Sequence, residues 1–314
     1  MHNKLSQAPS ELHAWRRLAR ASRKVLRAYS TNFFLVTRFL PPLERAEVEV
    51  IYASVRYPDE IVDSFQIPVS TKLALLYEWE AAYRDALQRQ GLRDAIRSGI
   101  PWILAGFGEL VRRRGIPPQH YLSFLQAMRR DAQPTFFPNL AALIDDYVYG
   151  SAIVVGYFLA YVYGHAPEAR MEDVLHCSRE LGIALQLTNF ARDVFEDYGR
   201  GRLYIPLDMM AEEGLTPDNY LEPTHEPALR RAIARLALHA EAGYEAARKN
   251  LGVFAPGCRA AIGACVEVYG KLNRRLLEAG APVRVRVSVS PAQKFRALPP
   301  DKYWRVPLAY AGLV

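Results

Sequence analysis

The chain has 314 residues, half of them apolar, and its 40 Lys and Arg exceed its 33 Asp and Glu to give a formal net charge of +7. That length and composition are ample for a large buried core in one or two domains. The charge excess suits an anionic substrate or an anionic membrane surface. Because the sequence has no run of five or six basic residues and no zinc-finger or RNA-binding signature, we expect no nucleic-acid partner.

The cysteines and the apolar segments indicate a cytoplasmic protein. Cys177, Cys258 and Cys265 form no C-x-x-C pair and are odd in number, so a reducing compartment is the simplest inference. The N-terminus lacks the apolar core of a signal peptide. The longest apolar stretch, residues 152–163, is too short to span a bilayer and predicts a buried helix. Residues 16–27 are strongly basic; a solvated helix face is the simpler interpretation, and peripheral contact with the inner face of the membrane is the alternative.

Helical periodicity runs through nearly the whole chain and is interrupted at Pro and Gly. It predicts helices over residues 11–28, 42–65, 70–91, 93–114, 118–131, 139–164, 168–198, 226–251 and 256–279. The alternating stretch 283–289 predicts either an edge strand or an extended tail laid across the helices. We therefore expect an all-α fold in a single domain over residues 15–296, after a flexible N-terminus (1–14) and before a C-terminal tail (297–314).

Two carboxylates stand out near residue 60. Asp59 and Asp63 are four residues apart, which on a helix places them about 40° apart around the axis and about 6 Å along it. Like charges at this spacing repel, and a single pair of this kind is usually no more than an exposed helix face. Pro58 stands directly before the pair and predicts a kink or a restart of the helix at the motif.

A second pair with the same spacing, Asp193 and Asp197, lies in an apolar stretch. Gln186 and Asn189 precede it on the same helix face, so the four side chains form one polar stripe. Mg²⁺ prefers oxygen ligands and usually completes its shell with water and substrate phosphate oxygens. We therefore expect two facing acidic pairs to bind Mg²⁺, with Mn²⁺ as an alternative, at a diphosphate. The metals would favour departure of the diphosphate from an allylic carbon, and the resulting cation would need a dry, apolar cavity.

Arginines accompany both acidic pairs. Arg56 lies three residues before Asp59, Arg192 directly precedes Asp193, and Arg200 and Arg202 follow the second pair. Arginine suits bidentate contacts with phosphate, and it equally suits salt bridges with neighbouring acids. The sequence leaves both uses open.

The residues around the second pair resemble the signature of the squalene/phytoene synthase family. That signature reads Q-L-T-N-x-x-R-D-V-x-E-D-x-x-R-G-R-x-Y-x-P, and residues 186–206 match it without a gap. The first pair is similar to the family's Y-x-x-x-R-x-x-D-D-x-x-D motif, with Glu60 in place of the second Asp. Residues 29–34 and 146–156 are similar to the family's flap near the diphosphate and to its channel-lining helix. The resemblance covers about residues 20–296.

The resemblance implies the isoprenoid synthase fold, a helical bundle around a central cavity. It also implies head-to-head (1′–1) condensation of two identical prenyl diphosphates through a cyclopropyl diphosphate. The metal ligands it implies are Asp59, Asp63, Asn189, Asp193 and Asp197. The substrate contacts it implies are Ser30, Arg56, Tyr147, Gln186, Asn189, Arg192, Tyr204 and Arg286. With the four aspartates, the expected catalytic residues are Tyr52 and Tyr269, whose rings or hydroxyls would steady a cation.

Several functions remain open within and beyond this resemblance. We rank phytoene formation from two geranylgeranyl diphosphates first, and squalene or dehydrosqualene formation from two farnesyl diphosphates second; only squalene formation would need NADPH. Ser151 and Ile153 stand where the family commonly has Val and Gly, which leaves the substrate's chain length open. A non-catalytic protein on a membrane surface would show a degraded acidic motif. A terpene cyclase would show a (N/D)-D-x-x-(S/T)-x-x-x-E motif, and the sequence has neither feature.

Overall fold

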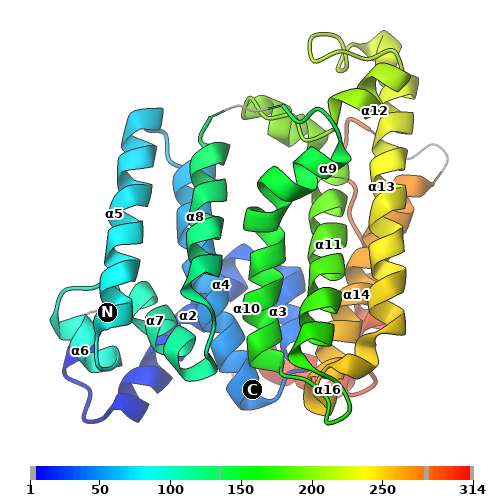
Figure 1. Cartoon of the computed structure of the whole chain (residues 1–314). Coiled ribbons are helices and arrows are strands. Elements are labelled where there is room, and N and C mark those ends of the chain that lie inside the picture. The colour runs from blue at the N-terminus through cyan, green and yellow to red at the C-terminus, as the bar shows by residue number, and fades with distance from the viewer. Residues whose placement is uncertain (1–4, 134–135, 279–282, 312–314) are drawn as a thin grey trace.

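The computed structural model describes residues 5–133, 136–278 and 283–311. Within these ranges the chain forms helices and no strand, and strand-like pairing is confined to one isolated bridge between His165 and Phe254. The long helices run side by side as one bundle, with α12 over one end and α16 at the other (Figure 1). This confirms the predicted all-α fold.

The first half of the chain supplies one side of the bundle. Its helices begin where the sequence signals predict: the Ser10 side chain caps the first long helix, and Pro42 and Pro118 occupy first-turn positions. Gly115 ends another helix in the left-handed conformation, with φ of 64°. The helices are α2 (Glu11–Tyr29), α3 (Thr31–Thr37), α4 (Pro42–Asp63), α5 (Val69–Gln88), α6 (Leu92–Arg97), α7 (Trp102–Arg114) and α8 (Pro118–Asp131).

The second half supplies the other side and the longest helix. These elements are α9 (Leu140–Leu143), η1 (Ile144–Ile153), α10 (Val154–Tyr163), α11 (Met171–Gly199), α12 (Leu207–Glu212), η2 (Pro223–His225), α13 (Glu226–Lys249), η3 (Leu251–Val253), α14 (Pro256–Leu277), α15 (Pro291–Ala297) and α16 (Lys302–Tyr310). Helix α11 packs against α10, α13 and α14, so it lies at the centre of this half.

Two predicted helices differ from the observed ones at prolines. The helix predicted over 93–114 is divided into α6 and α7, because Gly99 adopts a φ of 86° and Pro101 precedes the second helix. Of the two outcomes predicted at Pro58, a kink or a restart, the restart does not occur: α4 runs from Pro42 to Asp63 with Pro58 inside it. The acidic pair therefore lies on the last turns of one continuous helix.

The helix predicted over 139–164 contains a π-helical segment, η1, between two α-helical ends. By length and composition, Leu140–Tyr163 is the one helix of the described ranges that could cross a membrane. The segment was expected to be too short to span a bilayer, but the helix that contains it has 24 residues. In the bundle it packs against α4, α8 and α11, as expected of a core helix. Its small residues allow close contact: a Cβ on Gly150 would lie 2.6 Å from the Ser123 carbonyl oxygen, and one on Gly156 would lie 2.9 Å from that of Ser178.

Described residues near both ends of the chain pack against the bundle. Leu5 and Ala8 are buried, and α2 begins at Glu11, so the predicted flexible segment 1–14 includes residues that pack into the core; residues 1–4 lie outside the described ranges. The predicted C-terminal tail contains α16, whose Ala309 packs against Leu26 and Phe34. Apolar side chains at both ends find partners on the bundle, and burying them offsets the entropic cost of ordering these segments.

Residues 283–289 form an extended tail rather than a strand. The predicted alternation holds only at the end of the stretch: Val287 and Val289 are buried and Arg286 is exposed, but Val285 is 66% exposed. Arg286 reaches Asp193 on α11, so the tail places a basic residue beside the second acidic pair.

Candidate active site

Two adjoining cavities lie between the helices. The first has a volume of about 360 Å³ and is mainly apolar, with walls from α3, α4, α8, η1, α10, α11 and α14. The second has a volume of about 450 Å³ and is mainly polar, with Arg56, Arg192, Arg286 and Lys294 in its lining. The residues common to both linings are Ser30, Tyr52, Arg56, Asn189 and Tyr269. An apolar chamber that adjoins a cationic one suits a molecule with a long hydrocarbon chain and an anionic head.

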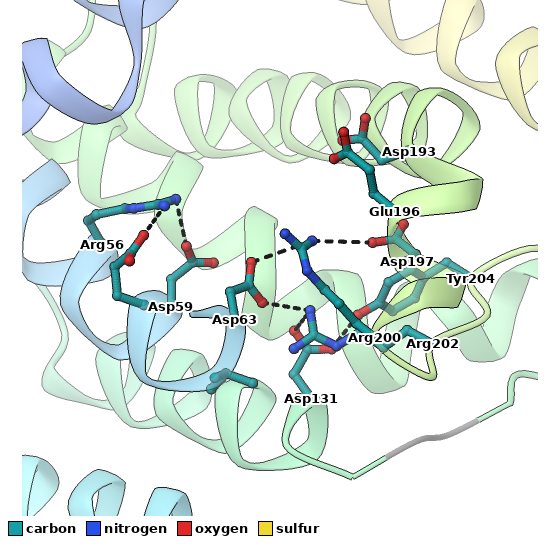
Figure 2. Close-up of polar contacts among 12 residues, drawn as sticks. Arg56, Asp59, Asp63, Asp131, Asp193, Glu196, Asp197, Arg200, Arg202 and Tyr204 are labelled. Carbon is teal, nitrogen blue, oxygen red and sulfur yellow. Dashed lines mark hydrogen bonds and ion pairs between the residues drawn. The ribbon is translucent and has the colours of Figure 1, made fainter. Parts of the chain in front are cut away.

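The first acidic pair lies at the boundary between the apolar cavity and solvent. Asp59 lines the cavity, and Arg56, one turn earlier on α4, donates to it at 2.7 Å and also pairs with Glu60 (Figure 2). Loss of surrounding water, followed by repulsion from Asp63, raises the pKa of Asp59 to about 7. The predicted association of Arg56 with this pair is therefore observed as a salt bridge.

The second acidic pair is divided by a local break in α11. Asp193 has φ −104° and ψ 15°, which are not helical values, and its carboxylate turns away from the other aspartates (Figure 2). Arg192 and Arg286 hold it, with Nε to Oδ1 distances of 2.7 and 2.9 Å. Gln186 and Asn189 line the apolar cavity, so Asp193 leaves the single polar stripe that the spacing predicts.

Asp197 faces Asp63 across the site. Arg200 lies between them, with its Nη1 3.7 Å from an Asp63 oxygen and 3.8 Å from an Asp197 oxygen (Figure 2). Burial, followed by repulsion from Asp193, raises the pKa of Asp197 to about 7. The two acidic helices thus approach each other, and arginine side chains neutralise the carboxylates between them.

Sequence reasoning missed a fifth aspartate of the site, Asp131, at the end of α8. Arg202 bridges it to the first pair, with its Nη1 2.7 Å from Asp63 and 3.4 Å from Asp131. The Tyr204 hydroxyl donates to Asp131 and lies 3.2 Å from the hydroxyl of Tyr147. Asp131 therefore holds the cation that orients Asp63. One signal could have found it: an acid in the last turn of a helix is unfavourable beside the negative end of the helix dipole.

Tyr204 does not line either large cavity. It is buried, with its ring stacked on Phe190 at 4.2 Å between centroids, and it lines a small separate recess with Asp131 and Arg202. The predicted diphosphate contact is therefore replaced, in this arrangement, by support of Asp131. Lys294, which no sequence motif singled out, takes a place in the cationic cavity beside Arg286.

The tyrosines predicted to steady a cation lie where the two cavities meet. Tyr52 and Tyr269 line both cavities, and Ser30 lies in both linings with them. Burial raises the pKa of Tyr52 to about 12, so its hydroxyl is neutral at physiological pH. Tyr147 lines the apolar cavity from η1. Neutral aromatic rings at the junction suit a developing allylic cation.

The carboxylates suit Mg²⁺ bound together with a substrate. Among the described ranges, no three Asp, Glu, His or Cys side chains converge closely enough to hold an ion by themselves. Mg²⁺ is usually held by one or two carboxylates plus substrate phosphate oxygens rather than by an all-protein cage. Asp59 and Asp63 offer oxygen ligands of that kind. Asp197 does so too, and Asp193 would join it once Arg192 and Arg286 release its carboxylate.

Replacing Asp131 with asparagine should raise the Mg²⁺ concentration that gives half-maximal activity by about 10- to 100-fold. The substitution removes a charge that shares Arg202 with Asp63, so Arg202 would compete more strongly with Mg²⁺ for Asp63. Steady-state rates against Mg²⁺ concentration measure the effect, with Asp208→Asn on α12 as the control. An unchanged Mg²⁺ dependence would show that Asp131 has no positioning role.

Comparison with known proteins identifies the family. The model of the squalene/phytoene synthase family matches residues 26–293. The chain belongs to the squalene/phytoene synthase family. It is 29% identical to a 15-cis-phytoene synthase of Enterobacter agglomerans over 86% of this chain and 90% of that protein. It is 32% identical to a presqualene diphosphate synthase of Sinorhizobium fredii, over 68% of this chain and 71% of that protein.

Solved structures share the fold of this family member. A dehydrosqualene synthase in complex with a ligand covers 96% of this chain and 100% of its own, with a TM-score of 0.76 and 22% identity. A squalene synthase from Alicyclobacillus acidocaldarius matches 83% of this chain over 93% of its own length, with a TM-score of 0.67 and 22% identity. The helical bundle around a cavity is therefore the fold of head-to-head prenyl diphosphate synthases.

Proposed function

We propose that this family member catalyses Mg²⁺-dependent head-to-head condensation of two geranylgeranyl diphosphates to phytoene, through a cyclopropyl diphosphate. The observation that carries the proposal is the placing of aspartates from α4 and α11 at two adjoining cavities: Asp59 lines the apolar chamber, and Asp193 pairs with two arginines that line the cationic one. The relatives named phytoene synthase, which match most of the chain, favour the C20 substrate over its shorter homologue.

A second candidate is condensation of two farnesyl diphosphates to presqualene diphosphate, squalene or dehydrosqualene. Relatives named presqualene diphosphate synthase are as similar in identity, at 30% and 32%, although they match less of the chain. In this candidate, NADPH would be required only for reduction to squalene. Incubation with each diphosphate, with and without NADPH, followed by mass analysis, separates the two. A C40 hydrocarbon formed without NADPH supports the first, and a C30 product formed in preference to it supports the second.

In this proposal the cationic cavity binds the diphosphates and the apolar cavity holds the hydrocarbon chains. Arg56, Arg192 and Arg286 bind and orient the diphosphates, and Lys294 adds a fourth positive charge. The apolar chamber excludes water from the reacting carbons, while Tyr52 and Tyr269 present neutral rings to positive charge. When bound to the aspartates, Mg²⁺ supplies Lewis-acid stabilisation of the departing diphosphate.

Removal of the metal should stop the reaction. EDTA in excess over divalent cation is expected to abolish turnover, because the Lewis acid that stabilises the departing diphosphate would then be missing. Excess MgCl₂ should restore the rate, and MnCl₂ serves as the comparison ion. Turnover that persists in EDTA would exclude the proposed Mg²⁺ dependence.

A further inference from the structure

The C-terminal helix α16 has its polarity reversed. Tyr303, Trp304 and Tyr310 are 72, 50 and 47% exposed, and they lie on one helix face together with Pro307. The charged Lys302 turns inward instead. A helix that meets only water shows the opposite pattern, with charges outside and rings inside.

The inward charges are fixed by the protein. The Lys302 Nζ donates to the carbonyl oxygens of Arg296 and Leu298, at 3.1 and 3.0 Å. Arg305 pairs with Asp301 and donates to the carbonyl oxygen of Arg38 at 3.0 Å. These hydrogen bonds fix the rotation of α16 about its axis, and this rotation keeps the aromatic face exposed.

A basic stripe adjoins this aromatic face. Helix α2 exposes four cations within one face, Arg16, Arg20, Lys24 and Arg27, and within the described ranges none of the four forms an ion pair. The Arg27 guanidinium lies 5.4 Å from the centroid of the Tyr310 ring, so the stripe and the aromatic face are continuous. Exposed Trp and Tyr are typical of the membrane–water interface, and Arg and Lys without ion pairs suit anionic lipid headgroups. The two features together therefore suit the surface of an anionic membrane.

The two features lie on the outer side of a cavity wall. Helix α3 lines the apolar cavity with Phe33, Val36 and Thr37. Its other side carries Phe34, which packs against Tyr310 at 6.0 Å between ring centroids. In Figure 1, α16 lies at the end of the bundle where α10 ends, and Tyr163 at that end also lines the cavity.

We propose that the aromatic face of α16, together with the basic stripe of α2, docks this protein on the surface of an anionic lipid bilayer. The surface places the wall of the apolar cavity next to lipid. Only the expected benefit of this docking rests on the proposed function, because a C30 or C40 hydrocarbon product must pass into an apolar phase. The docking itself follows from the exposed residues and needs no substrate.

Flotation of the full chain with vesicles tests the docking without any substrate, so its outcome is independent of the proposed reaction. We expect binding to vesicles of equal parts phosphatidylglycerol and phosphatidylcholine, and little binding to phosphatidylcholine alone. The double variant Tyr303→Ser, Trp304→Ser should bind about tenfold more weakly, because both interfacial rings are lost. The double variant Arg20→Glu, Lys24→Glu should also lose about tenfold, and raised salt should weaken binding of the wild type.

Matched controls lie elsewhere on the surface. Tyr77→Ser, Leu238→Ser removes two apolar side chains that are each 60% exposed, on α5 and α13. Arg231→Glu, Arg235→Glu reverses two cations at the same spacing as Arg20 and Lys24; unlike those, they pair with Glu213 and Glu212. Both controls should bind as the wild type does, and circular dichroism checks that every variant is folded.

Three outcomes would overturn the proposal. The wild type could fail to float with anionic vesicles, or the α16 and α2 variants could bind as tightly as the controls. Alternatively, sedimentation could show a dimer that the Tyr303→Ser, Trp304→Ser variant loses, with no vesicle binding, which would assign the face to a second copy of the chain.

Discussion

Asp193→Ala and Asp59→Ala should each lower kcat by about a thousandfold or more, with little change in helix content. Each substitution removes an oxygen ligand expected to hold Mg²⁺ at the diphosphate, and Lewis-acid stabilisation of a leaving group is worth several kcal/mol, at about 1.4 kcal/mol per tenfold in rate. Asp193 is held by Arg192 and Arg286 in this structure, so its loss also frees two cations of the polar cavity.

The same variants distinguish loss of a metal ligand from loss of the fold. Far-ultraviolet circular dichroism and the unfolding midpoint should stay near those of the wild type, since neither aspartate is among the buried residues of the core. Asp218→Ala, an exposed aspartate in the segment before α13, provides the control and should keep full activity. Mg²⁺-dependent turnover retained in either Asp59→Ala or Asp193→Ala would remove the basis for the metal assignment.

Glu49→Ala should lower the free energy of unfolding by about 3–5 kcal/mol. Glu49 on α4 pairs with Arg38, whose side chain is fully buried and also donates to the Phe34 carbonyl oxygen at 3.1 Å. Burial lowers the pKa of Arg38 to about 10, which shows how poorly that site tolerates an isolated cation. Without Glu49, the guanidinium would stay buried without its counter-charge.

Denaturant unfolding measures this loss through the midpoint, provided that the slope is unchanged. Glu78→Ala, an exposed residue of α5, should change stability by no more than about 0.5 kcal/mol. The double variant Arg38→Met, Glu49→Leu should recover much of the loss, because no charge then remains buried. A loss below about 1 kcal/mol in Glu49→Ala would mean that water reaches Arg38 and that the pair is not a structural anchor of α3.

Most helices could be predicted from the sequence because local signals and apolar periodicity agree. Helix α8 begins at Pro118 and ends at Asp131 as predicted, and Pro42 begins α4. The π-helical segment η1 was not predicted, since the apolar periodicity of 139–164 indicates a helix but does not distinguish π-helical from α-helical turns. The division near Gly99 depended on a positive φ that a glycine permits but does not require.

The candidate site was predictable where its residues lie in one continuous motif. The motif from Gln186 to Pro206 contains the second acidic pair and the arginines around it, so these residues could be predicted together. Asp131 and Lys294 were missed because each is a single residue on a distant helix, and only folding brings them to the site. The arginine partners of Asp193 were also unpredictable, since the break in α11 at that residue decides which way its carboxylate points.

The 1′–1 connection is tested most directly with geranylgeranyl diphosphate labelled with ¹³C at C1. Purified protein with Mg²⁺ should convert it to a C40 hydrocarbon, releasing two diphosphates for each product molecule. Head-to-head joining makes the two labelled carbons direct neighbours, so the product's NMR spectrum should show one-bond coupling between them. A product whose labelled carbons are separated by unlabelled ones, or a cyclised product from a single diphosphate, would contradict the proposed reaction.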